Sequence, residues 1–338
     1  IFFISVLLFF LGSGIWVALS MIGVSAIGMM LFTSRPVGDA MATTIWGTSS
    51  SWTLTALPLF VWMGEILFRT KLSENLFKGL SPWMQKLPGG LIHVNVVGCA
   101  LFAAISGSSA ATVATVGKMS IPELRKRNYP EKILLGSLAG SGTLGLLIPP
   151  SIILIIYGVA VQESIAKLFI AGIIPGIMIA LIFMSYVIIW SLINKKEMPK
   201  IIEEYSFLEK IKRSRQLLPI ILLISAVIGS IYTGVATATE AASLGVVGAL
   251  ILSYFQKSLN LETFRSSLLG ATKTSCMIAF ILAGSTFLSL AMGFTGLPRN
   301  LAIWIQNMDL SPYVLIIVLT IFYIILGMFL DGISAVVL

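Results

Sequence analysis

The sequence predicts an all-α integral membrane protein in which inverted repeats carry two re-entrant helical hairpins and broken helices. Of the 338 residues, 57% are hydrophobic and 11% are charged, and the mean hydropathy is +1.00. Soluble domains contain about a quarter charged residues, so much of this surface must face lipid. The apolar runs are continuous rather than alternating, which excludes a transmembrane barrel. The clustering of basic residues and an internal repeat then predict how the helices are oriented in the membrane.

The basic residues are gathered in a few short connections. Of 22 Lys and Arg residues, 19 fall within residues 69–86, 118–132, 195–215 and 257–273. This clustering is typical of cytoplasmic loops under the positive-inside rule. The formal charge of +8 therefore indicates membrane orientation rather than nucleic-acid binding.

The first third of the chain contains spans and one interfacial helix. Residues 1–12 and 14–33 form two apolar helices, and residues 53–69 form the next span after a polar stretch that ends at Ser51. Residues 72–86 place apolar side chains on one face and lysines around it. This pattern predicts an amphipathic helix that lies in the membrane interface.

A polar tip separates two short apolar runs, residues 91–105 and 110–121. The tip is Ser106-Gly107-Ser108-Ser109. Each run is short for a membrane span, and basic clusters flank both on the cytoplasmic side. The pattern therefore predicts a re-entrant hairpin whose tip lies at membrane depth.

Residues 132–158 form one apolar stretch that is interrupted several times. The interruptions are Gly140–Thr143, Gly145 and Pro149-Pro150. Two adjacent prolines remove two backbone donors, and lipid tolerates such a break only where the backbone lines a cavity or an ion site. We expect a broken helix at this place.

The remaining elements repeat these types. We expect membrane spans at residues 165–194, 217–235, 238–255 and 274–294. Amphipathic helices are expected at residues 261–273 and 297–308. The last apolar run, residues 313–338, contains Asp331-Gly332.

An internal repeat relates the two halves of the chain. An offset of 225 aligns Thr70 with Thr295, and it aligns Gly107 with Gly332. Counting spans from the basic clusters places the amphipathic arm 72–86 inside and the arm 297–308 outside. The repeats are therefore inverted, as in many secondary transporters. Because the chain begins at Ile1 and stops inside an apolar run, we expect both natural ends to lie beyond it.

The tips and the broken helix are the candidate ion sites. Hydroxyls, free carbonyls and half-helix ends suit Na⁺ and an adjoining anionic substrate. We expect one Na⁺ site between Ser106–Ser109 and Gly142–Pro150, and a second at Asp331–Ser334. The alternative is that these small residues only allow close helix packing. Asp331 is either a functional carboxylate or a cap for the hairpin turn.

The other polar residues favour structural roles. The single histidine, His93, is expected to be structural rather than a proton relay, and Glu65 and Glu240 to be interfacial or packing residues. Lys118 either meets an exiting anion or anchors the cytoplasmic side. Cys99 and Cys276 are expected to be buried thiols without a disulfide.

No motif for enzymatic or ATP-driven chemistry is present in the sequence. It contains no phosphate-cradling loop, no metal-ligand cluster and no nucleophile–base pair. Ion-coupled transport or facilitated passage remains, and we expect a protein that is not an enzyme.

Five segments together resemble the large membrane (permease) subunit of TRAP (tripartite ATP-independent periplasmic) transporters. The resemblance covers nearly the whole chain. The segments are Ala104–Thr112 (AISGSSAAT), Gly142–Ser151 (GTLGLLIPPS), Lys167–Gly176 (KLFIAGIIPG), Thr237–Ala242 (TATEAA) and Phe329–Gly332 (FLDG).

This resemblance implies a Na⁺-driven symporter that imports carboxylate-bearing solutes, such as C4-dicarboxylates, sialic acid or other sugar acids, by an elevator-like motion. It implies two partners, a small membrane subunit (separate or fused) and a periplasmic substrate-binding protein. It also implies a multi-pass protein of a bacterial or archaeal inner membrane. The cation sites that it carries over are Ser106, Gly107, Ser108, Ser109, Gly142, Gly145, Pro149 and Pro150, and Asp331, Gly332 and Ser334.

The resemblance divides the chain by transport role. The mobile transport domain is expected to hold the first hairpin with the broken helix and the first half of the second hairpin, and the scaffold to hold the rest. The segments are 1–90 (scaffold and cytoplasmic arm), 91–158 (transport), 159–273 (scaffold with basic connectors), 274–312 (scaffold and outer arm) and 313–338 (transport). Two alternatives stay open: a stand-alone Na⁺/dicarboxylate or anion carrier, and a membrane scaffold or intramembrane enzyme that does not transport.

Overall fold

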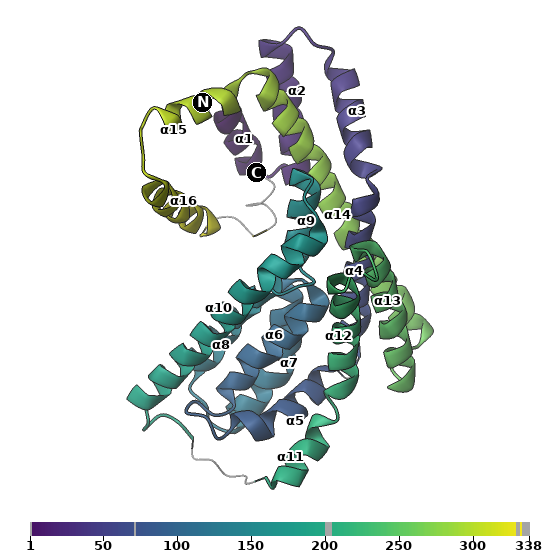
Figure 1. The fold of residues 1–338 in the computed structure, drawn as a ribbon, viewed down its shortest axis with the longest axis vertical. Helices are drawn as coiled ribbons and strands as arrows, with labels where there is room; N and C mark the ends of the chain where they lie inside the picture. The colour runs from purple at the N-terminus through teal and green to yellow at the C-terminus, as the bar shows by residue number, and fades with distance from the viewer. Residues whose placement is uncertain (1, 71, 200–204, 329–331, 333–338) are drawn as a thin grey trace. The chain divides into compact units, whose positions relative to one another are not determined.

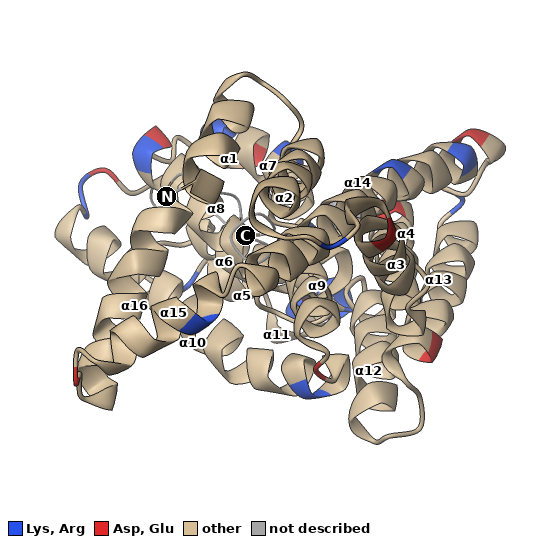
Figure 2. Cartoon of the chain, turned by 90° about the horizontal axis from the view of Figure 1, so that it is seen from above, with Lys and Arg blue, Asp and Glu red and all other residues tan. Residues whose placement is uncertain are grey.

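The computed structural model describes residues 2–70, 72–199, 205–328 and 332 (Figure 1). Every regular element in these residues is a helix, which confirms the all-α class. Among the described residues, three helices are long and apolar enough to cross a membrane, or up to five if each of two bent pairs counts as one span. Figure 2 shows most charged residues near helix ends or in connections, as expected for membrane helices.

The chain forms two compact units, which are described separately. The first contains residues 1–54 and 275–338, and the second contains residues 55–274. These units are defined by contacts, so the division by transport role stays a prediction.

The first unit is built from short apolar helices and part of one long helix. Its helices are α1 (Phe2–Gly12), α2 (Val17–Phe32), α3 (Val37–Ser49), the C-terminal part of α14 (Leu261–Phe294), α15 (Leu297–Gln306) and α16 (Pro312–Gly327). A turn at Gly14, whose φ is +80°, separates α1 from α2. The α2 helix packs against α14, where a Cβ at Gly284 would lie 2.8 Å from the Ala18 carbonyl oxygen.

Two elements and the exposure of one cysteine differ from the sequence prediction. The connector 261–273 and the span 274–294 form the single helix α14, since both segments have helical patterns and no proline lies between them. The polar stretch before Ser51 contains the helix α3. Cys99 is buried as predicted, but Cys276 is exposed, because it lies on an outer face of α14.

The second unit carries the first hairpin and the broken helix. Its elements are α4 (Ala56–Phe68), α5 (Leu72–Met84), α6 (Ile92–Ser106), α7 (Ser109–Lys126), α8 (Glu131–Gly142), the 3-10 turn η2 (Thr143–Leu146), α9 (Ile152–Val161), α10 (Ile165–Ile193), α11 (Phe207–Ser214), α12 (Leu218–Tyr232), α13 (Ala238–Phe255) and the start of α14. Helices α6, α7 and α8 lie side by side (Figure 1). Val96, Ala103 and Leu144 form a buried core there, against which Phe183 of α10 packs.

The predicted amphipathic arm is the helix α5. It buries Leu76, Phe77 and Leu80. The Trp83 indole nitrogen donates a hydrogen bond of 2.7 Å to Ser214 at the end of α11. The helix α11 lies within the basic connector and begins at a capping box between Ser206 and Glu209.

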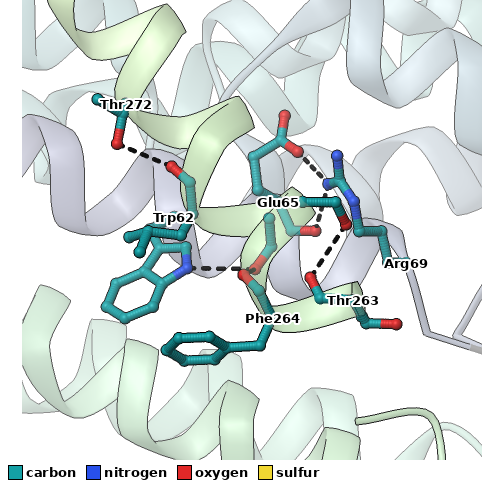
Figure 3. A network of polar contacts seen from close by, with 9 residues as sticks. Trp62, Glu65, Arg69, Thr263, Phe264 and Thr272 are labelled. Carbon is teal, nitrogen blue, oxygen red and sulfur yellow. Dashed lines mark hydrogen bonds and ion pairs between the residues drawn. The ribbon is translucent and has the colours of Figure 1, made fainter. Parts of the chain in front are cut away.

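Polar contacts attach α4 to the first turns of α14 (Figure 3). Trp62 donates to the Ser267 hydroxyl over 3.3 Å. Glu65 forms an ion pair with Arg69, the residue directly after the end of α4. A Cβ at Gly270 would lie 2.7 Å from the Glu65 carboxylate, so this glycine lets the two helices approach. Glu65 is therefore a packing residue, as predicted.

Glu240 also has a structural role. Its carboxylate accepts hydrogen bonds of 2.8 Å from the backbone and the hydroxyl of Thr237, which together cap α13. Such a cap stabilises a helix by about 1 kcal/mol. Glu240 is exposed and caps α13 rather than packing in a core, and its position at a membrane interface stays a prediction.

The contact between α2 and α14 can be tested with two glycines of one helix. Gly284→Ala should lower the stability of the purified protein by about 1–3 kcal/mol relative to Gly293→Ala, because overpacking is costly. Both changes raise helix propensity equally, and a Cβ at Gly293 meets nothing within 4 Å. Thermal unfolding in detergent measures the difference. Equal midpoints would contradict the close approach at Gly284.

Candidate cation and substrate site

The first hairpin turns at Gly107. This residue has a φ of +58°, which favours glycine, and its N–H donates to the Ala103 carbonyl over 3.0 Å. The next helix begins at once, because the Ser108 side chain accepts a hydrogen bond of 3.4 Å from the Ala111 N–H. The structure thus confirms two helices joined by a Ser-Gly tip.

Hydroxyl groups connect the two arms of the hairpin just below the tip. The Ser106 and Thr112 hydroxyls lie 2.9 Å apart. Thr112 also donates to the Ser108 carbonyl over 2.7 Å. Ser106 is 5% exposed and Thr112 is fully buried. Thr112 was not predicted as a site residue, although its position four residues after Ser108 on a helix was a usable signal.

The broken helix is confirmed at the double proline. The helix α8 ends at Gly142, η2 continues to Leu146, and α9 begins at Ile152. Pro149 and Pro150 are joined by a cis peptide bond. The fully buried Ser151 caps α9 and donates a hydrogen bond of 2.5 Å to the Leu146 carbonyl, so one side chain bridges the break. Sequence reasoning missed this role of Ser151.

The structure brings the tip and the break together. The Ile152 N–H donates to the Gly107 carbonyl over 3.3 Å. A Cβ at Gly107 would lie 2.8 Å from the Pro150 carbonyl oxygen. A Cβ at Gly145 would lie 2.9 Å from the Ser108 carbonyl oxygen. Two segments that the sequence analysis proposed as one site are therefore in direct contact.

The other predicted residues lie around this contact. A Cβ at Gly142 would overlap the Val113 side chain and lie 3.7 Å from the Ser109 carbonyl oxygen. Ser108 and Ser109 are half-buried, whereas Pro149 is buried. Of the second predicted site, Asp331 and Ser334 lie outside the described residues, so the structure describes only Gly332 there.

Neighbouring helices form the walls of this region through small residues. On α4, a Cβ at Gly64 would lie 3.0 Å from the Ser106 Cα atom. On α10, a Cβ at Gly172 would lie 2.8 Å from the Leu147 carbonyl oxygen. Close packing, the alternative explanation for the small residues, thus operates here, and it also places backbone oxygens beside the tip.

Four helix ends converge on this region. The C-terminal ends of α6 and η2 carry carbonyls with partial negative charge, and the N-terminal ends of α7 and α9 carry N–H groups with partial positive charge. Carbonyl and hydroxyl oxygens suit a hard cation, whereas helix N-termini suit an anion. The arrangement can therefore hold a cation and an anionic group next to each other.

The base of the hairpin is held by polar contacts. His93 is fully buried, and its Nε2 lies 2.8 Å from the Pro88 carbonyl oxygen, which supports the structural role. Asn95 donates to the Ser137 hydroxyl of α8 over 3.0 Å. The Tyr129 hydroxyl accepts from the Leu91 N–H over 3.0 Å, and burial raises the pKa of Tyr129, which keeps the hydroxyl neutral.

Comparison with known proteins shows that this chain is similar to transport proteins. Residues 3–338 match the family model "Tripartite ATP-independent periplasmic transporter, DctM component". The chain is 33% identical to the C4-dicarboxylate TRAP transporter large permease protein DctM of Pseudomonas aeruginosa, over 93% of this chain and 72% of that protein.

Two further relatives bear names with other solutes. The sialic acid TRAP transporter large permease protein SiaM of Vibrio cholerae is 30% identical over 96% of this chain and 76% of its own length. The 2,3-diketo-L-gulonate TRAP transporter large permease protein YiaN of Escherichia coli is 31% identical over 86% of this chain and 68% of its own length.

The contact between tip and break predicts the effect of a side chain at Gly107. Gly107→Ala should speed amide hydrogen exchange at residues 105–112 and 150–154, because the new Cβ would meet Pro150 and the left-handed backbone costs about 1 kcal/mol. Hydrogen-exchange mass spectrometry of the purified protein measures this. Gly136→Ala is the matched control, since its Cβ meets nothing within 4 Å. Unchanged exchange in both segments would argue against the contact.

Proposed function

Since the chain belongs to the family of DctM components of tripartite ATP-independent periplasmic transporters, we propose that it is a Na⁺-coupled symporter subunit that imports a carboxylate-bearing solute. The observation that carries the proposal is the direct contact between the Ser-Gly tip and the double-proline break. The relatives named for C4-dicarboxylate, sialic acid and 2,3-diketo-L-gulonate support a carboxylate as the shared chemistry of the solute.

The first Na⁺ site lies between the tip and the break. Its candidate residues are all in one unit of the chain, and the close approach of their backbones supports a shared set of oxygen ligands. They are Ser106, Gly107, Ser108, Ser109, Gly142, Gly145, Pro149 and Pro150. The second site is proposed at Asp331, Gly332 and Ser334, on the strength of the internal repeat and of the family resemblance.

The substrate carboxylate binds next to the first Na⁺ site. The N-termini of α7 and α9 supply partial positive charge there. No Lys or Arg lies between Ile92 and Gly117, so no fixed cation of the hairpin balances the anion near the tip. Helix dipoles, hydroxyls and the bound Na⁺ perform that role, which makes carboxylate binding depend on Na⁺.

The transport step is an elevator-like motion of inverted repeats. The arms α5 and α15 are both amphipathic, but α15 has Arg299 as its only charged residue, as expected for an arm outside the cytoplasm. Residues 91–158 and 313–338 move as the transport domain, and the arms with the remaining spans form the scaffold. Na⁺ binding orders the tips, which then accept the carboxylate.

The protein works in an inner membrane with two partners. A periplasmic binding protein delivers the solute, and a small membrane subunit, separate or fused, completes the permease. The description of the matching family supports this tripartite organisation. Uptake into proteoliposomes under an inward Na⁺ gradient tests it, with labelled carboxylates and with or without the binding protein. A need for both Na⁺ and the binding protein supports the proposal, whereas uptake with Na⁺ alone would assign the chain to stand-alone carriers.

Two variants at the tip test the first Na⁺ site. Ser109→Leu should abolish Na⁺-driven uptake, because a bulky apolar side chain replaces a candidate oxygen ligand at a closely packed tip. Ser106→Ala should raise the Na⁺ concentration for half-maximal uptake by about tenfold, because it removes a hydroxyl worth about 1–2 kcal/mol. Ser109 is half-buried and the Ser106 change is a truncation, so both proteins should fold and insert.

The control for these variants is Ser243→Leu on the exposed face of α13, which should keep normal uptake. Insertion is checked by expression level and by a monodisperse elution profile. Normal Na⁺ dependence in both tip variants would remove Ser106 and Ser109 from the site.

A further inference from the structure

The helix α11 in the second unit is short and strongly amphipathic. Phe207, Leu208 and Ile211 follow the helical spacing i, i+1 and i+4, so their side chains form one apolar face. These residues are 67%, 77% and 46% exposed, respectively. The described part of the chain therefore leaves most of this apolar face uncovered.

The position of α11 in the chain brings it close to the membrane. It ends at Ser214, and the apolar helix α12 begins at Leu218 after a link of three residues. The two helices together are long and apolar enough for a span, but they are bent by 56°. The charged residues of α11 are too costly to place in the hydrocarbon. A membrane-spanning α12 therefore holds α11 at the surface of the bilayer.

A tryptophan of the arm helix α5 packs on one edge of α11. The Trp83 indole donates to the Ser214 hydroxyl, and its ring lies edge-to-face with Phe207 at a centroid distance of 6.3 Å. The Lys210 ammonium lies 5.4 Å from the centre of the indole ring. Trp83 itself is 40% exposed. Tryptophan is enriched at membrane–water interfaces, because its ring is apolar and its N–H is polar.

The charge around the apolar face is positive. Lys212 and Arg215 are exposed, and neither forms an ion pair with a carboxylate that the structure describes. Residues 195–215 contain seven basic and four acidic residues, which gives a net charge of +3. This count includes Glu203 and Glu204, which lie outside the described residues. The connector therefore attracts anions as a whole.

An anionic lipid surface fits these features better than a protein partner does. The cores of protein interfaces are depleted in lysine, whereas Lys210 and Lys212 stand on either side of the apolar face on the helix. A helix in the membrane interface places its apolar side chains among acyl chains and extends its basic side chains to the headgroups.

We propose that α11 anchors this unit to the cytoplasmic leaflet, where its apolar face inserts among acyl chains and Lys212 and Arg215 bind the headgroups of anionic phospholipids. The contact with Trp83 transmits this attachment to the arm helix α5. The proposal involves neither the solute nor the coupling ion, so its test is independent of transport.

Quenching by brominated lipids tests the anchor in the full-length permease with its small subunit. A bimane fluorophore is attached to Leu208→Cys in a Cys276→Ser background, because Cys276 is exposed and Cys99 is buried. The vesicles contain equal parts of phosphatidylglycerol and phosphatidylcholine, and the acyl chains of one lipid at a time carry bromine. Brominated phosphatidylglycerol should quench about threefold more strongly than brominated phosphatidylcholine, because basic residues enrich the anionic lipid beside α11.

Two matched controls accompany this measurement. The change Lys212→Gln with Arg215→Gln should remove the preference for phosphatidylglycerol at the fluorophore. The change Lys195→Gln with Lys196→Gln removes the same charge from exposed residues of the same connector outside α11, and it should keep the preference. A fluorophore at Leu181→Cys, an exposed residue of the span α10, should be quenched equally by both lipids.

Three results would overturn the proposal. Quenching at Leu181→Cys but none at Leu208→Cys would show that protein rather than lipid covers the apolar face of α11. Equal quenching by the two lipids at Leu208→Cys would contradict the binding of anionic headgroups. Loss of the preference in both double variants would assign it to the total charge of the connector rather than to Lys212 and Arg215.

Discussion

The pairing of backbone groups at the hairpin tip is the constraint on which the second unit depends. In lipid, an unpaired N–H or carbonyl costs several kcal/mol, so irregular backbone is stable only where protein groups satisfy it. The tip and the double-proline break satisfy one another through the bond from the Ile152 N–H to the Gly107 carbonyl. Side-chain hydroxyls complete the pairing, since Thr112 donates to Ser108 and Ser151 donates to Leu146.

The same constraint explains the small residues around the tip. Gly107, Gly145 and Gly172 each face a backbone oxygen that lies within 2.9 Å of a Cβ position. Larger residues would separate the segments and leave their polar groups unpaired in the membrane. Close packing and ion binding are therefore not competing explanations here, because the packing that satisfies the backbone also gathers the oxygens that a cation needs.

Much of the fold follows from sequence patterns, whereas the pairing partners do not. The hairpin and the break were predictable, because serine, glycine and proline interrupt apolar runs in a way that has few structural solutions in lipid. The roles of Thr112, Ser151 and Tyr129 were missed, since each depends on a contact with a neighbouring turn or a distant segment. The continuous helix α14 was missed because a change from amphipathic to apolar composition does not by itself end a helix.

Positive charge at the hairpin tip differs in kind from positive charge near the C-terminal end of α7, and this difference matters for the proposed transport. In the proposed function, positive charge at the tip comes from helix dipoles and a removable Na⁺, so the proposal has the affinity for an anion fall when Na⁺ leaves. Further along the helix, Lys118 and Lys126 carry positive charge that is always present. A fixed cation at the tip would retain the solute in every state, and transport requires binding that is weak enough to reverse. Under the proposed function, permanent charges that lie at least two turns from the tip leave the control of anion binding to the Na⁺ gradient.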